Sequence, residues 1–130
     1  MAKRIQLSRT KGWRMPPNTV NCARPSRWGN PFRVERCGNG WHVVCPSGLT
    51  SVEYPTKGHA ALWAANRYRD WLDGLGAGED AIIERHARRN WILDHLHKLR
   101  GKDLACWCKI GDSCHCDVLL EMANNPEPRP

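Results

Sequence analysis

The sequence has little phenylalanine, few acidic residues for its basic ones, and no long apolar stretch. One Phe stands against seven Trp, and 13 acidic residues stand against 20 basic ones. No window approaches the roughly 20 apolar residues of a membrane span, and residues 1–9 lack the apolar run of a signal peptide. We therefore expect a cytoplasmic protein with no membrane partner.

The sequence also lacks the even cysteine count of a closed disulfide framework, since it holds seven cysteines. Free or metal-bound thiols in a reducing compartment are the better interpretation, and they again indicate the cytoplasm. Internal repeats and sustained heptads are absent as well. The 130 residues therefore predict one domain, long enough to bury its own core.

The excess of basic residues gives a formal net charge of +7. Such a balance favours polyanionic partners, which are nucleic acid, nucleotides or an acidic protein surface. A soluble protein that happens to be basic is the alternative, and charge alone does not decide between them. The seven tryptophans are equally compatible with a buried core and with a platform on which a ligand stacks.

Hydrophobic periodicity predicts an α/β fold for residues 1–125, as a single compact domain. We expect a small sheet that could be mixed, with helices packed against it and a β-hairpin insertion turning at residues 38–40. Residues 126–130 are predicted to be a disordered C-terminal tail. The predicted strands are 4–9, 19–23, 33–37, 41–45 and 103–108, and the predicted helices are 61–75, 79–100 (with a new start at Asn90 as one option) and about 114–124.

Residues 24–32 form a rigid loop with binding potential. Two prolines, a glycine and an asparagine dictate a defined, non-repetitive backbone. Its arginines and its indole suit a phosphate or a base. The alternative is a structural turn pinned to the core by Trp28 and Phe32, and no phosphate-loop spacing tips the balance. The candidate ligand-binding residues are Arg24, Ser26, Arg27, Trp28 and Asn30.

Residues 106–116 hold four of the cysteines and one histidine. These are zinc-ligand types, and the candidate set is Cys106, Cys108, Cys114 and His115, with Cys116 as an alternative to His115. Geometry tempers this hypothesis. Alternate residues of a straight strand lie ~6.6 Å apart, so the first two cysteines can share a metal only if the strand bends or ends at Trp107. Within one helix, residues 114 and 116 point roughly 200° apart.

A reactive thiol is the second interpretation of this cluster. Cys114 is predicted at a helix N-terminus, after Asp112 or Ser113 as cap, where the helix dipole stabilises a thiolate. His115 could act as its base, which makes Cys114 and His115 the candidate catalytic residues. The third interpretation is that the cysteines are small buried hydrophobic side chains.

The loop and the cluster together resemble a domain-of-unknown-function family of small phage and bacterial proteins. Its pattern is a WGNPF-type loop, a Tyr/Trp-bearing helix, an LRGK-x-L-x-CWC strand and a CH-x-DVL helix. The resemblance implies a phage or bacterial origin but no activity, and it argues against Cys116 as an essential ligand. The pattern falls on Arg24, Ser26, Trp28, Gly29, Asn30, Pro31, Phe32, Tyr68, Cys106, Trp107, Cys108, Cys114, His115 and Asp117.

Two functional hypotheses follow from the sequence. The first is a protein that binds or processes a nucleotide or a nucleic-acid phosphate in a cleft between residues 24–32 and 106–115. Arg24 and Arg27 would hold phosphate, Trp28 would stack, and Cys114 with His115 would act on the ligand or hold a zinc ion. The alternative is a zinc-stabilised basic module that binds nucleic acid or a host protein and catalyses nothing. A phage-encoded chain would work in the host cytoplasm.

Overall fold

A computed structural model describes residues 2–74 and 83–125 of the chain. It confirms the predicted α/β fold. The predictions made for residues 79–82 and for the tail at 126–130 lie outside the described residues. In chain order the elements are β1 (Arg4–Gln6), β2 (Thr19–Asn21), β3 (Arg33–Cys37), β4 (Gly40–Val44), α1 (Lys57–Leu72), α2 (Ile83–His95), the 3₁₀ helix η1 (Leu96–Leu99), β5 (Asp103–Cys106) and α3 (His115–Asn124).

The sheet consists of three parallel strands in the order β1-β5-β2. The central strand β5 is the most apolar, and its Leu104 and Ala105 are fully buried, as expected for a strand covered on both faces. Because the strands are parallel, their carboxyl ends meet at one edge. Cys22 and Cys106 reach that edge side by side: the Cys22 amide donates to the Ala105 carbonyl at 2.8 Å.

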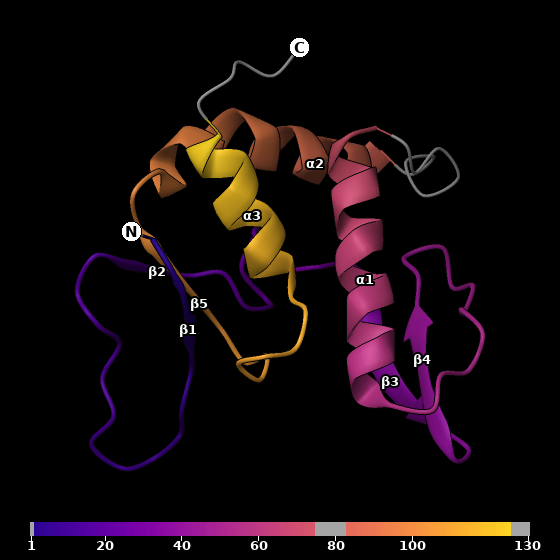
Figure 1. The fold of residues 1–130 in the computed structure, drawn as a ribbon. Coiled ribbons are helices and arrows are strands. Elements are labelled where there is room, and N and C mark those ends of the chain that lie inside the picture. Colours follow the sequence, from indigo (N-terminus) through magenta and orange to yellow (C-terminus); the bar gives the residue numbers. More distant parts are fainter. Residues whose placement is uncertain (1, 75–82, 126–130) are drawn as a thin grey trace.

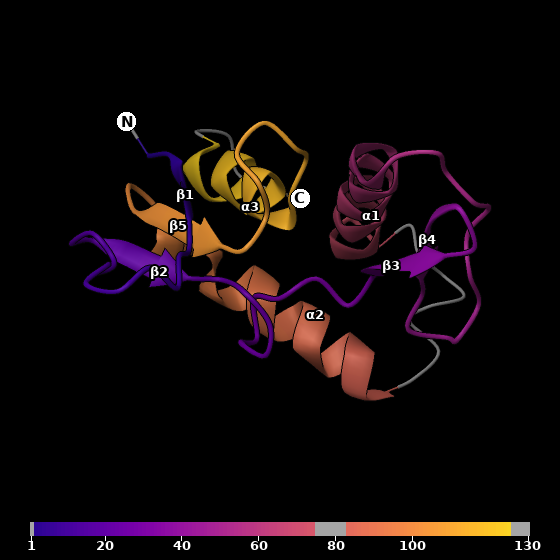
Figure 2. The same ribbon diagram turned by 90° about the horizontal axis from the view of Figure 1, so that it is seen from below.

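The β3–β4 hairpin forms a second, separate sheet (Figure 1). It lies on the opposite side of the molecule from the three-stranded sheet, and α1 and α3 stand between the two; the view from below agrees (Figure 2). Helix α1 contacts the hairpin and α3, while α3 contacts β5 and β1. Helix α2 lies across the end at which α1 and α3 finish (Figure 1). The core is therefore continuous from hairpin to sheet.

The hairpin turn is one residue shorter than the predicted turn at residues 38–40. Cys37 pairs with Gly40, so the connecting loop has two residues. A third segment joins β4 beside this turn, since Trp41 and Tyr54 exchange backbone hydrogen bonds at 2.8 and 2.6 Å. A Cβ on Gly40 would lie 2.5 Å from the Tyr54 carbonyl oxygen, so only glycine allows this approach. All seven cysteines are in the described part of the chain, and none forms a disulfide.

The helices form where they were predicted, but their ends differ. Helix α1 begins at Lys57, earlier than expected, because the Thr56 side chain caps it by accepting from the His59 amide at 3.2 Å. Helix α2 runs through Asn90 without a new start and turns into η1 at Leu96. Within residues 2–74 and 83–125, no helix is long and apolar enough to cross a membrane.

Tyr68 ties helix α1 to the loop at residues 24–32. Its buried hydroxyl donates to the Trp28 carbonyl at 2.8 Å. We expect Tyr68→Phe to lower the free energy of unfolding by about 1–3 kcal/mol, because the carbonyl is left buried without its donor. Urea denaturation measures this, with Tyr54→Phe at a half-buried tyrosine as the matched control, expected within about 0.5 kcal/mol of wild type. Equal losses in both variants would contradict the anchoring role.

Candidate ligand pocket and metal centre

A pocket of about 590 Å³ opens between the loop at residues 24–32 and the turn at residues 106–115. The structure thus brings together the two segments that the sequence singled out, which are far apart in the chain. Its wall combines cysteines, cations and two aromatic rings. The residues that line it include Arg24, Asn30, Phe32, Lys57, Cys106, Trp107, Cys108, Lys109, Asp112, Cys114 and His115.

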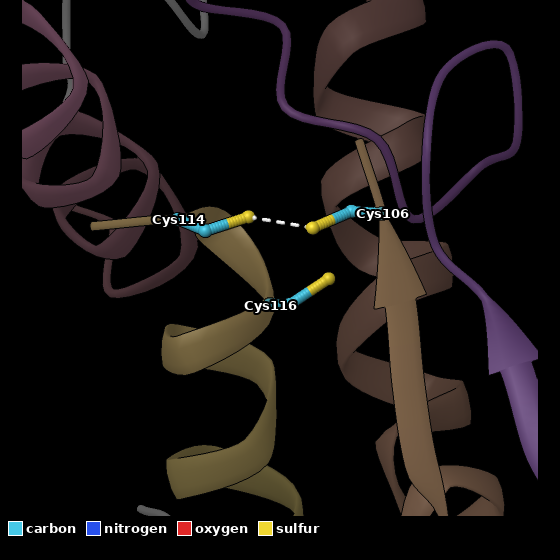
Figure 3. A group of neighbouring side chains, drawn as sticks. All are labelled: Cys106, Cys114 and Cys116. Carbon is cyan, nitrogen blue, oxygen red and sulfur yellow. Dashed lines mark hydrogen bonds between the residues drawn. The ribbon is translucent and has the colours of Figure 1, made fainter. Parts of the chain in front are cut away.

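Strand β5 ends at Cys106, and the chain bends at Trp107 and Cys108. Because the strand ends before Trp107, the side chains of Cys106 and Cys108 are not held at the spacing of a straight strand and can approach a common point. Figure 3 shows the thiols of Cys106, Cys114 and Cys116 pointing toward one another from the strand end and the start of α3. The sulfurs of Cys106 and Cys114 are 3.1 Å apart, and all three residues are buried.

Cys114 is itself the N-cap of α3, so the prediction of Asp112 or Ser113 as cap is wrong. Its backbone is extended, with φ −149° and ψ 153°, while α3 proper begins at His115. A cap residue outside the helix does not follow helical angular spacing. This is why Cys114 and Cys116 converge, contrary to the 200° separation expected within one helix.

His115 belongs to a second group of potential metal ligands. The donor atoms of Cys108, Cys114 and His115 lie within 4.8 Å of one another, as do those of Cys106, Cys114 and Cys116. The His115 Nε2 lies 2.7 Å from the Cys22 carbonyl oxygen. A carbonyl only accepts, so Nε2 carries a proton and Nδ1 is the atom turned to the Cys114 sulfur, 3.5 Å away. The cluster can therefore hold a metal ion.

No pattern in the sequence points to Cys22 as part of this site. Its contribution is a backbone carbonyl, which any residue could supply, and only the parallel pairing of β2 with β5 brings it to His115. The pairing of Tyr68 with His115, with ring centroids 5.4 Å apart in an edge-on contact, fixes the imidazole from its other side.

The thiols and the imidazole shift each other's protonation. The hydrogen bond with Cys106 opposes ionisation of Cys114, but those from Cys108, Cys116 and His115 outweigh it and lower the pKa of Cys114 to about 5. Burial works to lower the pKa of His115, yet its contacts with Cys108 and Cys114 raise it to about 10. The neighbouring Cys106 and Cys114, together with burial, raise the pKa of Cys116. Cys114 is the natural thiolate of the cluster.

Arg4 holds the turn and the helix start together. Its guanidinium donates to the Asp117 carboxylate at 3.2 Å and to the Lys109 carbonyl at 3.0 Å. The same carboxylate accepts from the Cys114 amide at 3.1 Å, completing a capping box. Strand β1, the turn and α3 are thereby fixed to one another. Sequence reasoning missed Arg4 because 113 positions separate it from Asp117.

The loop at residues 24–32 is pinned from inside by Asn30. The Asn30 side chain accepts from the Phe32 amide at 2.9 Å and donates to the Ala64 carbonyl on α1 at 3.1 Å. Arg88 on α2 adds donors to the loop carbonyls of Ser26, Arg27 and Gly29. The loop is therefore a preformed element of the pocket wall.

The predicted ligand-binding residues fall in two places. Arg24 and Asn30 line the pocket, whereas Ser26, Arg27 and Trp28 lie outside its lining. Trp28 is buried edge-on against Trp91, and the exposed Arg27 lies over that same indole. The pocket therefore gives no support to the predicted binding role of these three residues, which is untested.

Contacts within its own loop orient the Arg24 side chain. It donates to the Asn30 carbonyl at 3.2 Å, and a Cβ on Gly29 would come within 2.7 Å of the Arg24 Cγ. Glycine at position 29 thus leaves the room that this arginine side chain occupies. Burial, followed by the nearby Arg33, lowers the pKa of Arg24. A cation that is partly desolvated beside another cation favours an anion as its partner.

Comparison with known families assigns the chain to one of them. The family model for a domain of unknown function, DUF4326, matches residues 5–125. The chain belongs to this family. The match confirms the predicted membership of a domain-of-unknown-function family, while the motif positions and the phage origin of this DUF4326 member stay predictions. The chain matches no curated protein and no solved structure.

The capping box of α3 in this DUF4326 member can be tested by removing the Asp117 carboxylate. We expect Asp117→Ala to cost about 1 kcal/mol of folding free energy, the usual value for a lost helix cap. The matched control is Asp70→Ala, which removes an exposed i,i+3 pair with Arg67 and should cost at most about 0.5 kcal/mol. Urea denaturation of both variants decides, and a larger loss at position 70 would contradict the assigned cap.

Proposed function

We propose that this protein binds the phosphate of a nucleotide or of a nucleic acid in the pocket between residues 24–32 and 106–115. The observation that carries the proposal is the charge on the pocket wall. Three fixed cations, Arg24, Lys57 and Lys109, line the pocket against a single carboxylate, Asp112. Its volume of about 590 Å³ falls within the range usual for small-molecule sites.

Two helix starts add to this positive potential. Lys57 is the first residue of α1, and Cys114 and His115 are the cap and first residue of α3; all three line the pocket. Figure 1 shows both helices beginning at the same end of the molecule. Helix N-termini carry partial positive charge and favour anions. The cations and the helix ends therefore act in the same direction.

An aromatic side chain is available for a base. Trp107 lines the pocket and is 47% exposed, and the Arg9 guanidinium lies 4.6 Å from its ring centroid. A partly exposed indole beside cations is typical of surfaces on which bases stack. The assignment of Trp107 to stacking replaces the sequence-based choice of Trp28, which is buried.

Isothermal titration with mononucleotides, dinucleotides and short oligonucleotides tests the proposal. We expect Arg24→Ala and Lys57→Ala each to weaken binding by about 10- to 100-fold, the loss expected for a charge-assisted contact. Arg27→Ala is the matched control, because it removes an exposed arginine from the same loop but outside the pocket. Binding that is absent, or that Arg27→Ala weakens as much as Arg24→Ala, would contradict the proposal.

The second candidate function is a zinc-stabilised basic module that binds nucleic acid or a host protein without catalysing a reaction. The specific observation in its favour is the burial of Cys106, Cys114 and Cys116, each at most 2% exposed. Structural zinc sites are closed in this way, with thiolates as ligands. Here the metal would fasten the end of β5 to the start of α3.

Zinc binding has its own test. We expect one zinc per chain by elemental analysis, and a fall in the thermal midpoint on the order of 10 °C when a chelator removes it. The reason is linkage: zinc at 100-fold above its dissociation constant adds about 2.7 kcal/mol to stability. A metal-free protein with one rapidly alkylated thiol would contradict the zinc module and favour a reactive Cys114.

A further inference from the structure

We propose that Cys108, Cys114 and His115 form a three-ligand metal site whose fourth coordination position opens into the pocket, where a phosphoryl oxygen of the bound ligand occupies it. This inference rests on the proposed binding of zinc and of phosphate. It differs from a closed structural site in making the ion part of the binding surface. Three protein ligands and one open position are the arrangement of zinc sites that bind or activate a ligand.

Distances separate this triad from the alternative of Cys106, Cys114 and Cys116. With Zn–S near 2.3 Å and Zn–N near 2.05 Å, a tetrahedral ion sets sulfur–nitrogen edges of about 3.6 Å and sulfur–sulfur edges of about 3.8 Å. The Cys114 sulfur is 3.5 Å from the His115 Nδ1, which matches. It is only 3.1 Å from the Cys106 sulfur, which is shorter than two thiolates on one zinc allow. We therefore place Cys106 outside the ligand set, as a hydrogen-bond partner of Cys114.

The orientation of His115 supports the same triad. A metal-binding histidine donates a hydrogen bond from its second ring N–H to a carbonyl or carboxylate, which fixes the tautomer. His115 does this through Nε2 toward the Cys22 carbonyl at 2.7 Å, leaving Nδ1 toward the cysteines. Two thiolates and a neutral imidazole also balance the charge of Zn²⁺.

The open position follows from where the triad lies. Cys108, Cys114 and His115 all line the pocket, and Cys108 is partly exposed there. Among the residues that the structure describes, each group of potential ligands has three members. No further Cys, His, Asp or Glu there places a ligand atom within 4.8 Å of all three. The remaining position is therefore left to the occupant of the pocket, in which Arg24 and Lys57 would hold the same phosphate.

Cobalt substitution tests the ligand set. Reduced, metal-free protein receives one equivalent of Co²⁺, and its thiolate-to-cobalt charge-transfer band should have the intensity of two thiolates. Cys108→Ala should weaken Co²⁺ affinity more than about 100-fold, because removing a residue that only hydrogen-bonds to a metal ligand costs up to about 100-fold and removing a ligand should cost more. The matched variants Cys106→Ala and Cys116→Ala should stay within about 100-fold. A loss in either that equals the loss in Cys108→Ala overturns the assignment.

The open position is tested on the wild-type protein, so it does not depend on how any variant folds. Imidazole, and separately inorganic phosphate, should shift the cobalt d–d bands saturably. Bands that imidazole leaves unchanged mean a closed site and overturn the inference. A shift with imidazole but none with phosphate upholds the open position and contradicts the phosphate ligand. Titration of the metal-free protein with nucleotides then shows whether the proposed function fails as well.

Discussion

The parallel pairing of β5 between β1 and β2 is the constraint on which the site depends. Parallel strands end at the same edge, and ligand sites in open α/β sheets lie beyond that edge. Here the pairing places the Cys22 carbonyl beside the end of β5 and directs the chain from Cys106 into the turn. Antiparallel pairing of β2 would send Cys22 to the opposite edge, and His115 would lose its acceptor.

Each wall of the pocket is held by side chains that do not line it. Arg88 and Tyr68 bind the carbonyls of the loop at residues 24–32. Arg4 binds the turn and, through Asp117, the start of α3. These contacts join segments far apart in sequence, so the entropy of ordering both walls is lost on folding and not on binding. A preformed pocket of this kind suits a small charged ligand better than a partner that must reshape it.

Local patterns in the sequence predicted the elements, and topology decided the contacts between them. The strand that begins at Asp103, the helix from about 114 and the rigidity of the Arg24–Phe32 loop follow from residue types that act over a few positions. The roles of Arg4 and Cys22 do not, because they arise from partners about a hundred residues away. The cap at Cys114 was missed for a different reason: a thiol is not among the preferred cap residues, and here the Asp117 carboxylate completes the cap.

Charge balance explains how one wall can serve thiols, a metal and a phosphate together. At neutral pH a Cys114 with a pKa near 5 is a thiolate, and a His115 with a pKa near 10 is its imidazolium partner, so this pair is neutral. Zn²⁺ bound by two thiolates and a neutral His115 imidazole would also carry no net charge. The metal would therefore supply a coordination position and not an excess of positive charge. In the metal-free and in the metal-bound protein alike, Arg24, Lys57 and Lys109 supply the long-range attraction for phosphate. The cations therefore contribute attraction, and the metal ion contributes a coordination position.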